Sequence, residues 1–410
     1  MSGVSCVAFK RYAEPTLGKM LQPAQALPDE VLAPYLKAGH VTWKGLNLPE
    51  VLPEMWVKES NISELHPNVG DLLVCEGGEV GRATLVTTPL DSSTIIQNSV
   101  HLVRPGVNAN TRYLKYALEQ VASSGWLDIV CNKATIAHLT VDKLRELQVP
   151  FQRLADQERI ANFLDDKTAR IDALIAEKGE LARAVEELRE SVISDSVTLS
   201  NVPGWRQTRL KFLVQDIIDT EHKTVPFQDN GEYLVARTTN IKKGRLVLDG
   251  AKYTDMAGFE EWTKRATPSL GDILFTREAP AGEACLVPEN VSLCLGQRTV
   301  LIRLRKDLAH APFVLWSFYG GLASKFISDL SQGSTVAHFN MPDIGNIPLF
   351  TGPLEDQSRR ADELEIKLRQ MDDLSAHIQD HIARLREYRS SLISAAVTGQ
   401  LDLSTFKDPA

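Results

Sequence analysis

The chain repeats itself with a period close to 200 residues, and this repeat restricts the possible folds more than any other feature. GDLL at 70–73 matches GDIL at 271–274, and LADQER at 154–159 matches LEDQSR at 354–359. Further matches pair QNSVHL (97–102) with QRTVLI (297–302) and SVISDSVT (191–198) with SLISAAVT (391–398). The offset stays at 200 from Gln97 to Thr198, so we interpret the chain as two tandem copies of one module.

Each copy has the same internal order. Short β-like runs with Gly and Pro punctuation come first, then a short helix, a proline-bearing exit and a long charged helix without proline. The predicted fold is α+β, with two duplicated mixed α/β domains joined by two long helices that form an antiparallel coiled coil with pseudo-two-fold symmetry. We expect domains at 1–153 and 200–353, with helical segments at 154–199 and 354–410.

The long charged segments show apolar residues at alternating spacings of three and four, which is typical of a coiled-coil seam. Lys178 and His381 interrupt the two stripes at different places, which would help to fix the register. An amphipathic helix packed on a globular core is the alternative. The predicted seam consists of Leu164, Ile171, Leu174, Leu181, Val185, Leu188, Leu364, Met371, Leu374, Ile378, Leu385 and Leu392.

Bulk properties are those of an ordinary globular protein. The 410 residues carry a net charge of −8, so any contact with nucleic acid must come from local basic clusters. The 5 cysteines are scattered without metal-ligand spacing, which favours a reducing, cytoplasmic location. No apolar run is long enough for a membrane span, and the first residues lack the order of a secretory signal.

Motifs for catalysis are missing from the sequence. It contains no phosphate-binding loop, no HExxH, no nucleophile elbow and no paired metal-binding motif. GSTVAHFN at 333–340 suggests a Ser/His site, but the matching KATIAHLT at 133–140 has Ala134 opposite Ser334. We therefore expect no enzyme, and we interpret Thr335 and His338 as part of a loop that closes the domain or contacts DNA.

The ends of the two copies resemble the specificity subunit of type I restriction–modification systems. The resemblance is carried by LADQERIANFLDDKTARIDALI (154–175), LREYRSSLISAAVTGQLDL (385–403), the GDILF phrase and GWRQTRLKFLV (204–214). It covers nearly the whole chain, twice and in the same order. The first copy departs from it, because its helix ends Val197-Thr198-Leu199 without the glycine, and residues 1–30 match poorly.

The resemblance implies an adaptor that reads DNA and performs no chemistry. Each target-recognition domain would read one half of a split, asymmetric site in double-stranded DNA, and the helices would set the gap between the halves. Its partners would be two modification (methyltransferase) subunits and two restriction/translocase subunits. S-adenosylmethionine, ATP and Mg²⁺ would belong to those partners, so no cofactor is expected in this chain, and no membrane is involved.

The candidate DNA contacts are basic and amide side chains near the start of each copy and in two later turns. In copy one, Glu76 and Asn98 stand where Arg277 and Arg298 stand in copy two, as expected if the copies read different sequences. The candidates are Lys37, Lys44, Arg237, Asn240, Lys242, Lys243, Arg245, Arg277 and Arg298.

Two alternatives remain open at the level of sequence. One is a coiled-coil scaffold with two domains that bind ligands other than DNA, which the net charge of −8 supports. The other is the specificity subunit of a related adaptor-type restriction system.

Overall fold

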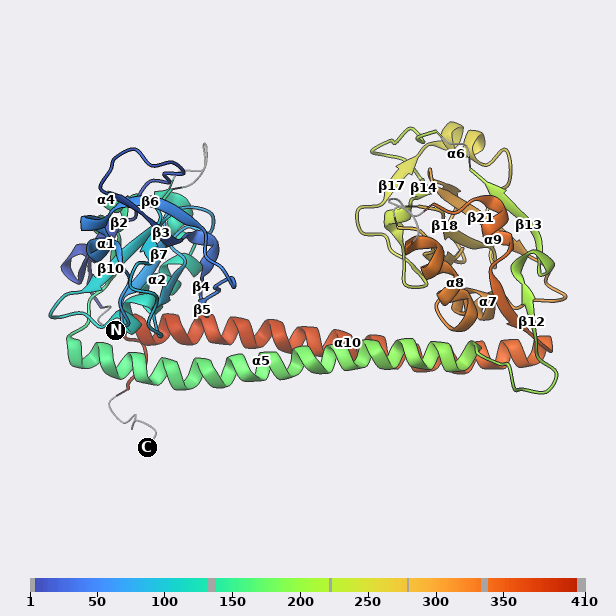
Figure 1. The fold of residues 1–410 in the computed structure, drawn as a ribbon. Helices are drawn as coiled ribbons and strands as arrows, with labels where there is room; N and C mark the ends of the chain where they lie inside the picture. Colours follow the sequence, from blue (N-terminus) through green and yellow to red (C-terminus); the bar gives the residue numbers. More distant parts are fainter. Residues whose placement is uncertain (1–3, 132–137, 221–222, 279, 333–337, 404–410) are drawn as a thin grey trace. The chain divides into compact units, whose positions relative to one another are not determined.

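The computed structural model describes residues 4–131, 138–220, 223–278, 280–332 and 338–403. Thr135 and Thr335 of the repeated Thr/His stretches lie outside these ranges. The chain divides into two compact units, of which unit 1 is Met1–Lys178 with Asp380–Ala410 and unit 2 is Gly179–Gln379. Each unit contains strands and helices (Figure 1), so the predicted mixed helix and strand content is confirmed.

Unit 1 begins with a domain of short strands and ends on a long helix. Its strands are β1 (Cys6–Ala8), β2 (Ala13–Leu17), β3 (Glu30–Leu36), β4 (Val41–Thr42), β5 (Gly45–Leu46), β6 (Glu54–Lys58), β7 (Leu72–Cys75), β8 (Ala83–Leu85), β9 (Ile95–Ile96), β10 (Val100–Pro105) and β11 (Gln148–Pro150). Its helices are η1 (Phe9–Arg11), η2 (Ala38–His40), α1 (Glu59–Leu65), α2 (Thr111–Ser123), α3 (Trp126–Val130), α4 (Val141–Glu146), the first part of α5 (Leu154–Val197) and the last part of α10 (Leu354–Val397).

Unit 2 repeats this order. Its strands are β12 (Arg206–Arg209), β13 (Val214–Asp219), β14 (Tyr233–Ala236), β15 (Ile241–Lys242), β16 (Arg245–Leu246), β17 (Lys252–Thr254), β18 (Ile273–Thr276), β19 (Ala284–Leu286), β20 (Leu293–Leu295), β21 (Thr299–Leu304) and β22 (Pro348–Thr351). Its helices are η3 (Leu210–Phe212), η4 (Thr238–Asn240), α6 (Met256–Trp262), α7 (Ala311–Ser317), α8 (Gly321–Gln332), α9 (Met341–Gly345), the first part of α10 (Leu354–Val397) and the last part of α5.

Strand pairing follows one plan in both units. Unit 1 has sheets with the orders β2-β10-β7-β8, β6-β3-β9, β1-β11 and β4-β5. Unit 2 has the same four sheets with every strand number raised by eleven. In the β10 and β21 ladders, Leu72 pairs with Val103 and Ile273 pairs with Ile302. Equivalent residues are therefore 201 positions apart in β7 and β18 and 199 positions apart in β10 and β21, so the sequence offset of 200 is only an average.

A matched glycine occupies a restricted place in each unit. Gly81 and Gly282 both have positive φ, at 77° and 91°, a conformation that favours glycine. A Cβ atom at Gly81 would lie 2.4 Å from Leu127, and one at Gly282 would lie 2.5 Å from Ile327. The repeated glycine therefore serves a turn and close packing rather than a ligand.

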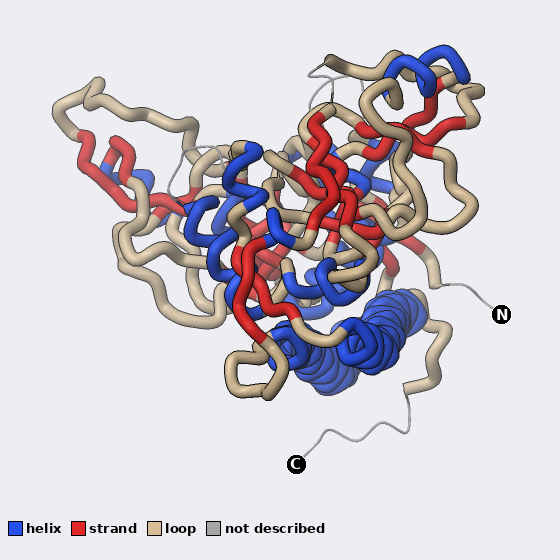
Figure 2. Tube along the Cα trace, turned by 90° about the vertical axis from the view of Figure 1, so that its right-hand side faces the viewer, coloured by secondary structure: helices blue, strands red, loops and turns tan. Residues whose placement is uncertain are grey.

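The main core of each unit includes residues of both long helices. In unit 1, Leu164 of α5 and Ile393 of α10 belong to the same buried cluster as β7, β10 and α2. In unit 2, Ile193 of α5 and Leu364 of α10 join the equivalent cluster. The early part of α5 thus lies beside the late part of α10 in unit 1, where Figures 1 and 2 show the two helices side by side.

The predicted seam consists of two columns, each made of residues seven positions apart along a helix. One column lies in the contact between α5 and α10, and the other does not. Leu164, Ile171, Val185, Leu364 and Ile378 are buried, and Met371, Leu385 and Leu392 are half-buried. By contrast, Leu174, Leu181, Leu188 and Leu374 are 41–53% exposed. The second column therefore lies one residue further along each helix. It comprises Thr168, Ile175, Ala182 and Arg189 on α5 and Leu368, Ser375, Ile382 and Arg389 on α10, all buried or half-buried.

Polar pairing explains why the second column differs from the prediction. The Thr168 hydroxyl donates to the Leu164 carbonyl at 2.6 Å, so it needs no water. Arg189 forms an ion pair with Asp372, and Arg389 forms one with Asp172. Because these side chains are paired, they can occupy the contact between helices, and the leucines beside them face outward.

Candidate nucleic-acid interface

The basic candidates near the start of each copy lie on equivalent hairpins. In unit 2, η4 leads into the β15–β16 hairpin, and in unit 1, η2 leads into the β4–β5 hairpin. The Val247 amide donates to the Asn240 carbonyl at 2.7 Å, and the Asn47 amide donates to the His40 carbonyl at 2.8 Å. The backbone is thus built alike in both units, whereas the side chains on the hairpins differ.

Asn240 and His40 hold their loops from inside. The Asn240 side chain is fully buried, donates to the Val247 carbonyl at 2.9 Å and accepts from the Arg237 amide at 3.4 Å. His40 Nδ1 accepts from the Lys37 amide at 3.3 Å. Burial lowers the pKa of His40, and the Lys37 charge lowers it further, which keeps this nitrogen available as an acceptor. The Asn240 amide is therefore used by the loop itself and does not face a ligand.

Two of the predicted cations tie the unit 2 hairpin to the long helices. Lys243 forms an ion pair with Glu186 of α5. Arg245 contacts Glu365 of α10 at 2.9 Å, and its guanidinium lies 5.4 Å from the ring centroid of Trp316. These pairs position the hairpin within unit 2. Lys242, on the same hairpin, is exposed.

A surface cavity of about 300 Å³ brings together Arg237 and Arg298, which lie 61 positions apart in the sequence. The Arg237 guanidinium lies over the Phe227 ring at 5.8 Å, and its Nη2 donates to the Gly250 carbonyl at 2.7 Å. Its Nε is buried and has no hydrogen-bond partner among the described residues. The cavity is lined by Thr224, Val225, Phe227, Val235, Arg237, Thr238, Thr239, Gly296, Gln297 and Arg298.

Arg277 lies beneath this surface. Its side chain is 7% exposed, its Nη1 donates to Asp219 at 2.6 Å, and its Nε donates to the Phe339 carbonyl at 2.9 Å. Its guanidinium thus joins β13 to Phe339, near the end of the second Thr/His stretch. The structure places Arg277 in a supporting position rather than on the surface.

Strand register changes one of the expected correspondences between the copies. The Arg277 amide donates to the Arg298 carbonyl at 2.9 Å, and the Glu76 amide donates to the Ser99 carbonyl at 2.9 Å. Arg298 is therefore equivalent to Ser99 and not to Asn98, because the β21 region is offset by 199 residues. The expected match of Arg277 with Glu76 agrees with this register.

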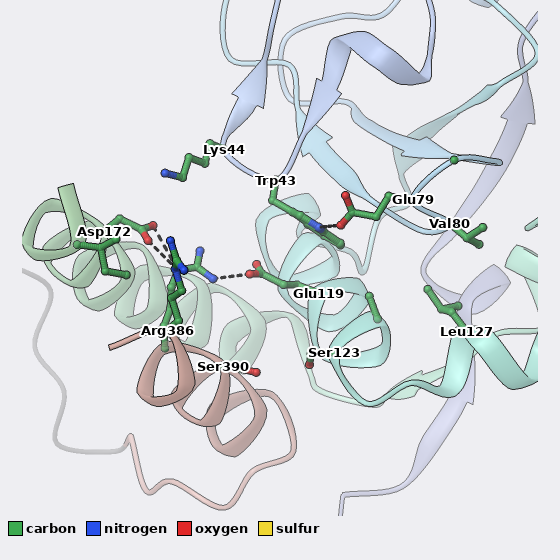
Figure 3. Close-up of a pocket in the computed structure, with 14 residues that line it drawn as sticks. Trp43, Lys44, Glu79, Val80, Glu119, Ser123, Leu127, Asp172, Arg386 and Ser390 are labelled. Carbon is green, nitrogen blue, oxygen red and sulfur yellow. Dashed lines mark hydrogen bonds and ion pairs between the residues drawn. The ribbon is translucent and has the colours of Figure 1, made fainter. Parts of the chain in front are cut away.

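Unit 1 presents its two predicted cations, Lys37 and Lys44, as exposed side chains. Lys44 borders a cavity of about 770 Å³ between the hairpin, α2 and the long helices of this unit (Figure 3). On the wall of this cavity Arg389 contacts both Glu119 and Asp172, and the Trp43 Nε1 donates to Glu79 at 2.6 Å. The charges of Arg389, Glu119 and Asp172 are paired within unit 1, so the cations that this cavity offers to a ligand are the exposed Lys44 and Arg386.

Sequence reasoning missed the neutral members of the unit 2 cavity. Gln297 and Phe227 line it beside the two arginines, yet only Gln297 had a signal, since it precedes Arg298 in the repeated block. Phe227 belongs to the loop between β13 and β14, which lies outside the matched sequence blocks. In the described part of the chain, no group of three or more His, Cys, Asp or Glu residues could hold a metal ion. None of the helices described combines the length and apolar character needed to cross a membrane.

Comparison with known proteins gives a consistent result. No family model matches the chain. The Type I restriction enzyme EcoBI specificity subunit of Escherichia coli is 20% identical over 320 residues, covering 71% of this chain and 66% of that subunit. The StySPI specificity subunit of Salmonella potsdam is 19% identical over 404 residues, covering 93% and 85%. The match to EcoBI thus spans slightly less than two thirds of that subunit.

Solved structures show the same fold. A chain from a study of complex assembly and conformational transition of the type I R-M system aligns with a TM-score of 0.73, 16% identity and coverage of 98% and 99%. The HsdS subunit from Thermoanaerobacter tengcongensis aligns with a TM-score of 0.53, 17% identity and coverage of 98% of each chain. The resemblance predicted from the sequence is confirmed: in sequence and in fold, the chain is similar to the specificity subunits of type I restriction–modification systems.

Proposed function

We propose that this chain is the non-catalytic DNA sequence-specificity subunit of a type I restriction enzyme. It recognises a bipartite, asymmetric site in double-stranded DNA, one half with each unit. The observation that carries the proposal is the identical strand pairing of two units whose side chains differ at equivalent positions, such as the exposed Arg298 and the half-buried Ser99. Equal scaffolds with different surface residues are what two readers of different half-sites require.

Fewer residues contact DNA in this proposal than the sequence predicted. In unit 2 the contacting surfaces are the cavity of Arg237 and Arg298 and the exposed Lys242. Asn240 and Arg277 support this surface from within, and Lys243 and Arg245 are paired with carboxylates of the long helices. In unit 1 the contacting residues are Lys37 and Lys44. Arginine offers a forked donor pair to a guanine edge, and exposed lysines attract phosphates.

The long helices serve as the spacer in this proposal. α5 and α10 form an antiparallel coiled coil, and a pseudo-two-fold axis relates the domains 1–153 and 200–353 and the helical segments 154–199 and 354–410. The matched ion pairs Arg389–Asp172 and Arg189–Asp372 support this symmetry, because each residue has its counterpart 200 positions away. A helix of 44 residues extends about 66 Å at about 1.5 Å per residue.

The outward-facing leucines supply docking sites for partners. Leu174 and Tyr388 are 44% and 58% exposed in unit 1, and their counterparts Leu374 and Leu188 are 45% and 53% exposed in unit 2. In unit 1, Leu174 and Tyr388 border an apolar groove of about 340 Å³ that Lys178, His381 and Arg384 surround. Exposed apolar side chains repeated at equivalent places suit two copies of one partner.

The partners in this proposal are two methyltransferase subunits and, through them, two restriction/translocase subunits. S-adenosylmethionine, ATP and Mg²⁺ are placed in those subunits. The complex works in the cytoplasm, where the host DNA is modified.

Selection from a randomised duplex library tests the proposal. The full-length chain, purified with its methyltransferase subunits, should select two short motifs separated by a gap of fixed length. Affinity should fall steeply with salt because phosphate contacts release counterions. Binding without any sequence preference would contradict the proposal and favour a scaffold that binds ligands other than DNA.

A further inference from the structure

A chain of polar groups leads from the interior of unit 2 to the Arg237/Arg298 cavity. It begins at the ion pair between the half-buried Asp219 and the buried Arg277, with 2.6 Å between Oδ2 and Nη1. Nη2 of Arg277 lies 3.2 Å from Nε2 of His338, whose Nδ1 lies 3.5 Å from Oε1 of Glu278. Oε2 of Glu278 lies 3.6 Å from Nε of Arg298. Four contacts thus connect a rigid core element to an arginine on the surface.

The backbone of Arg298 is fixed in an uncommon conformation. Its φ is 72°, in the left-handed region that residues with a side chain seldom adopt. Its carbonyl accepts the Arg277 amide at 2.9 Å, so the same residue that begins the polar chain also holds the backbone. Left-handed residues of this kind concentrate at functional sites, where the surroundings enforce them.

The Arg298 side chain is held on one side only. It is 47% exposed, and its Nε faces Glu278. Among the described residues, no hydrogen bond involves its two Nη atoms. The carboxylate beside Nε lowers the net positive charge at this point and repels a phosphate, whereas the two Nη nitrogens remain as donors for a neutral acceptor pair.

From these contacts we infer that Arg298 reads a guanine base edge rather than a phosphate, and that Glu278 is the positioning residue that selects the base over the backbone. The inference rests on the proposed function and deepens it. Guanine presents O6 and N7 as two acceptors in the major groove, which match the two free donors of a guanidinium. A phosphate would gain from full positive charge, which Glu278 removes.

The pair of Arg298 and Glu278 occurs in unit 2 and has no counterpart in unit 1. Ser99 and Gly77 occupy the equivalent positions in unit 1, as the matching amide–carbonyl contacts indicate. Changes at Arg298 should therefore alter one half of the recognised site and leave the other half unchanged.

Library selection with three variants tests the inference. The variants are Arg298→Ala, Arg298→Lys and Glu278→Gln, each in the full-length chain with its methyltransferase subunits. Arg305→Ala is the matched control, because Arg305 is an exposed arginine paired with Asp307 just beyond the opposite end of β21. Thermal melting confirms that each variant is folded.

Both Arg298 variants should lose about 10- to 100-fold discrimination at a single G·C base pair, with the rest of the motif retained. Because Lys lacks the forked donors but keeps the charge, equal losses in Ala and Lys indicate a base contact. Glu278→Gln should raise affinity for non-specific DNA and steepen its salt dependence. The control should select the wild-type motif.

Three outcomes would overturn the inference. In the first, Arg298→Ala weakens binding to all sequences equally and lowers the salt slope by about one, as loss of a phosphate contact does. In the second, Arg298→Lys behaves as wild type. In the third, neither Arg298 variant changes the motif. If the wild-type complex itself selects no motif, the proposed function fails, which is a separate result from a wild-type motif that Arg298 does not influence.

Discussion

Arg389 on α10 forms an ion pair with Asp172 on α5, and 3.1 Å separates its Nε from Oδ1 of the aspartate. Arg389 also contacts Glu119 of α2, so one guanidinium joins both long helices to the strand domain of unit 1 (Figure 3). In unit 2 the equivalent residues, Arg189 and Asp372, form the same helix-to-helix pair. Each arginine lies between the helices, and Arg189 occupies the place that sequence patterning assigned to its neighbour Leu188.

Replacing Arg389 should therefore destabilise unit 1. The Arg389→Met variant leaves Glu119 and Asp172, whose side chains are 16% and 33% exposed, without their shared cation. We expect a loss of about 2 kcal/mol in the free energy of unfolding, measured by urea denaturation. Arg386→Met, on an exposed position one turn earlier, should change stability by less than about 0.5 kcal/mol. Equal stability of the two variants would show that the pair contributes nothing.

The exposed leucine column should matter for assembly and not for folding. Leu174→Ser and Leu374→Ser alter side chains that are 44% and 45% exposed, so the melting temperature should change little. Retention of the methyltransferase subunit during co-purification should fall, and the double variant should retain least. Leu368→Ala is the contrasting variant, because Leu368 is fully buried and its truncation should cost about 3 kcal/mol. Full retention by the double variant would exclude this surface as the docking site.

A buried histidine should make unit 1 sensitive to acid. His101 is fully buried, and its Nε2–H donates to the Leu139 carbonyl at 2.6 Å, while Nδ1 has no partner among the described residues. Burial lowers the pKa of His101, against smaller opposing effects of that hydrogen bond and of Glu76. The unfolded chain, with a pKa of about 6.5, therefore takes up a proton before the folded chain does.

The stability contributed by neutral His101 should thus be complete above about pH 6.5 and decline as the pH falls below that value. Urea denaturation at pH 7.5 and at pH 5.5 measures the decline. His101→Gln keeps a donor for Leu139 but cannot be protonated, so its loss between these two pH values should be smaller than that of the wild type. His377→Gln, at an exposed position on α10, should behave as wild type. A His101→Gln variant with an unchanged pH dependence would contradict this assignment.

Sequence patterning located the long helices and one column of their contact, because Leu164, Ile171 and Ile378 are both apolar and correctly spaced. It could not locate the second column, because the residue three positions and the residue four positions after each member of the first column both lie close to the same helix face. Hydrophobicity then favoured Leu181 over Ala182 and Leu188 over Arg189, and it does not distinguish Leu174 from Ile175. Only the positions of the paired aspartates, known from the fold, show why an arginine belongs inside.

The candidate DNA contacts show a similar limit. Basic residues near the start of each copy were recognisable as a cluster, yet the sequence does not show which of them are paired with acidic side chains. Lys243 and Arg245 are paired with Glu186 and Glu365, which lie on helices far away in the sequence. The meeting of Arg237 with Arg298 depends on the parallel pairing of β14 with β20, a contact that no local pattern encodes.

Lengthening the spacer should change the gap in the recognised site and nothing else. One heptad adds about 10 Å to a helix, which corresponds to about three base pairs of DNA. Because the helices are antiparallel in the proposed spacer, heptads must be inserted together, after Lys178 in α5 and after Gln379 in α10, to keep the Arg389–Asp172 and Arg189–Asp372 pairs in register. Methylome sequencing of a host that carries the double insertion should report the same two half-sites with a longer gap.

An insertion in α5 alone is the control, and it should reduce stability and modification, because one helix then exceeds its partner by seven residues. A double insertion that changed the bases of either half-site would show that the helices take part in base recognition and do not act as a spacer alone.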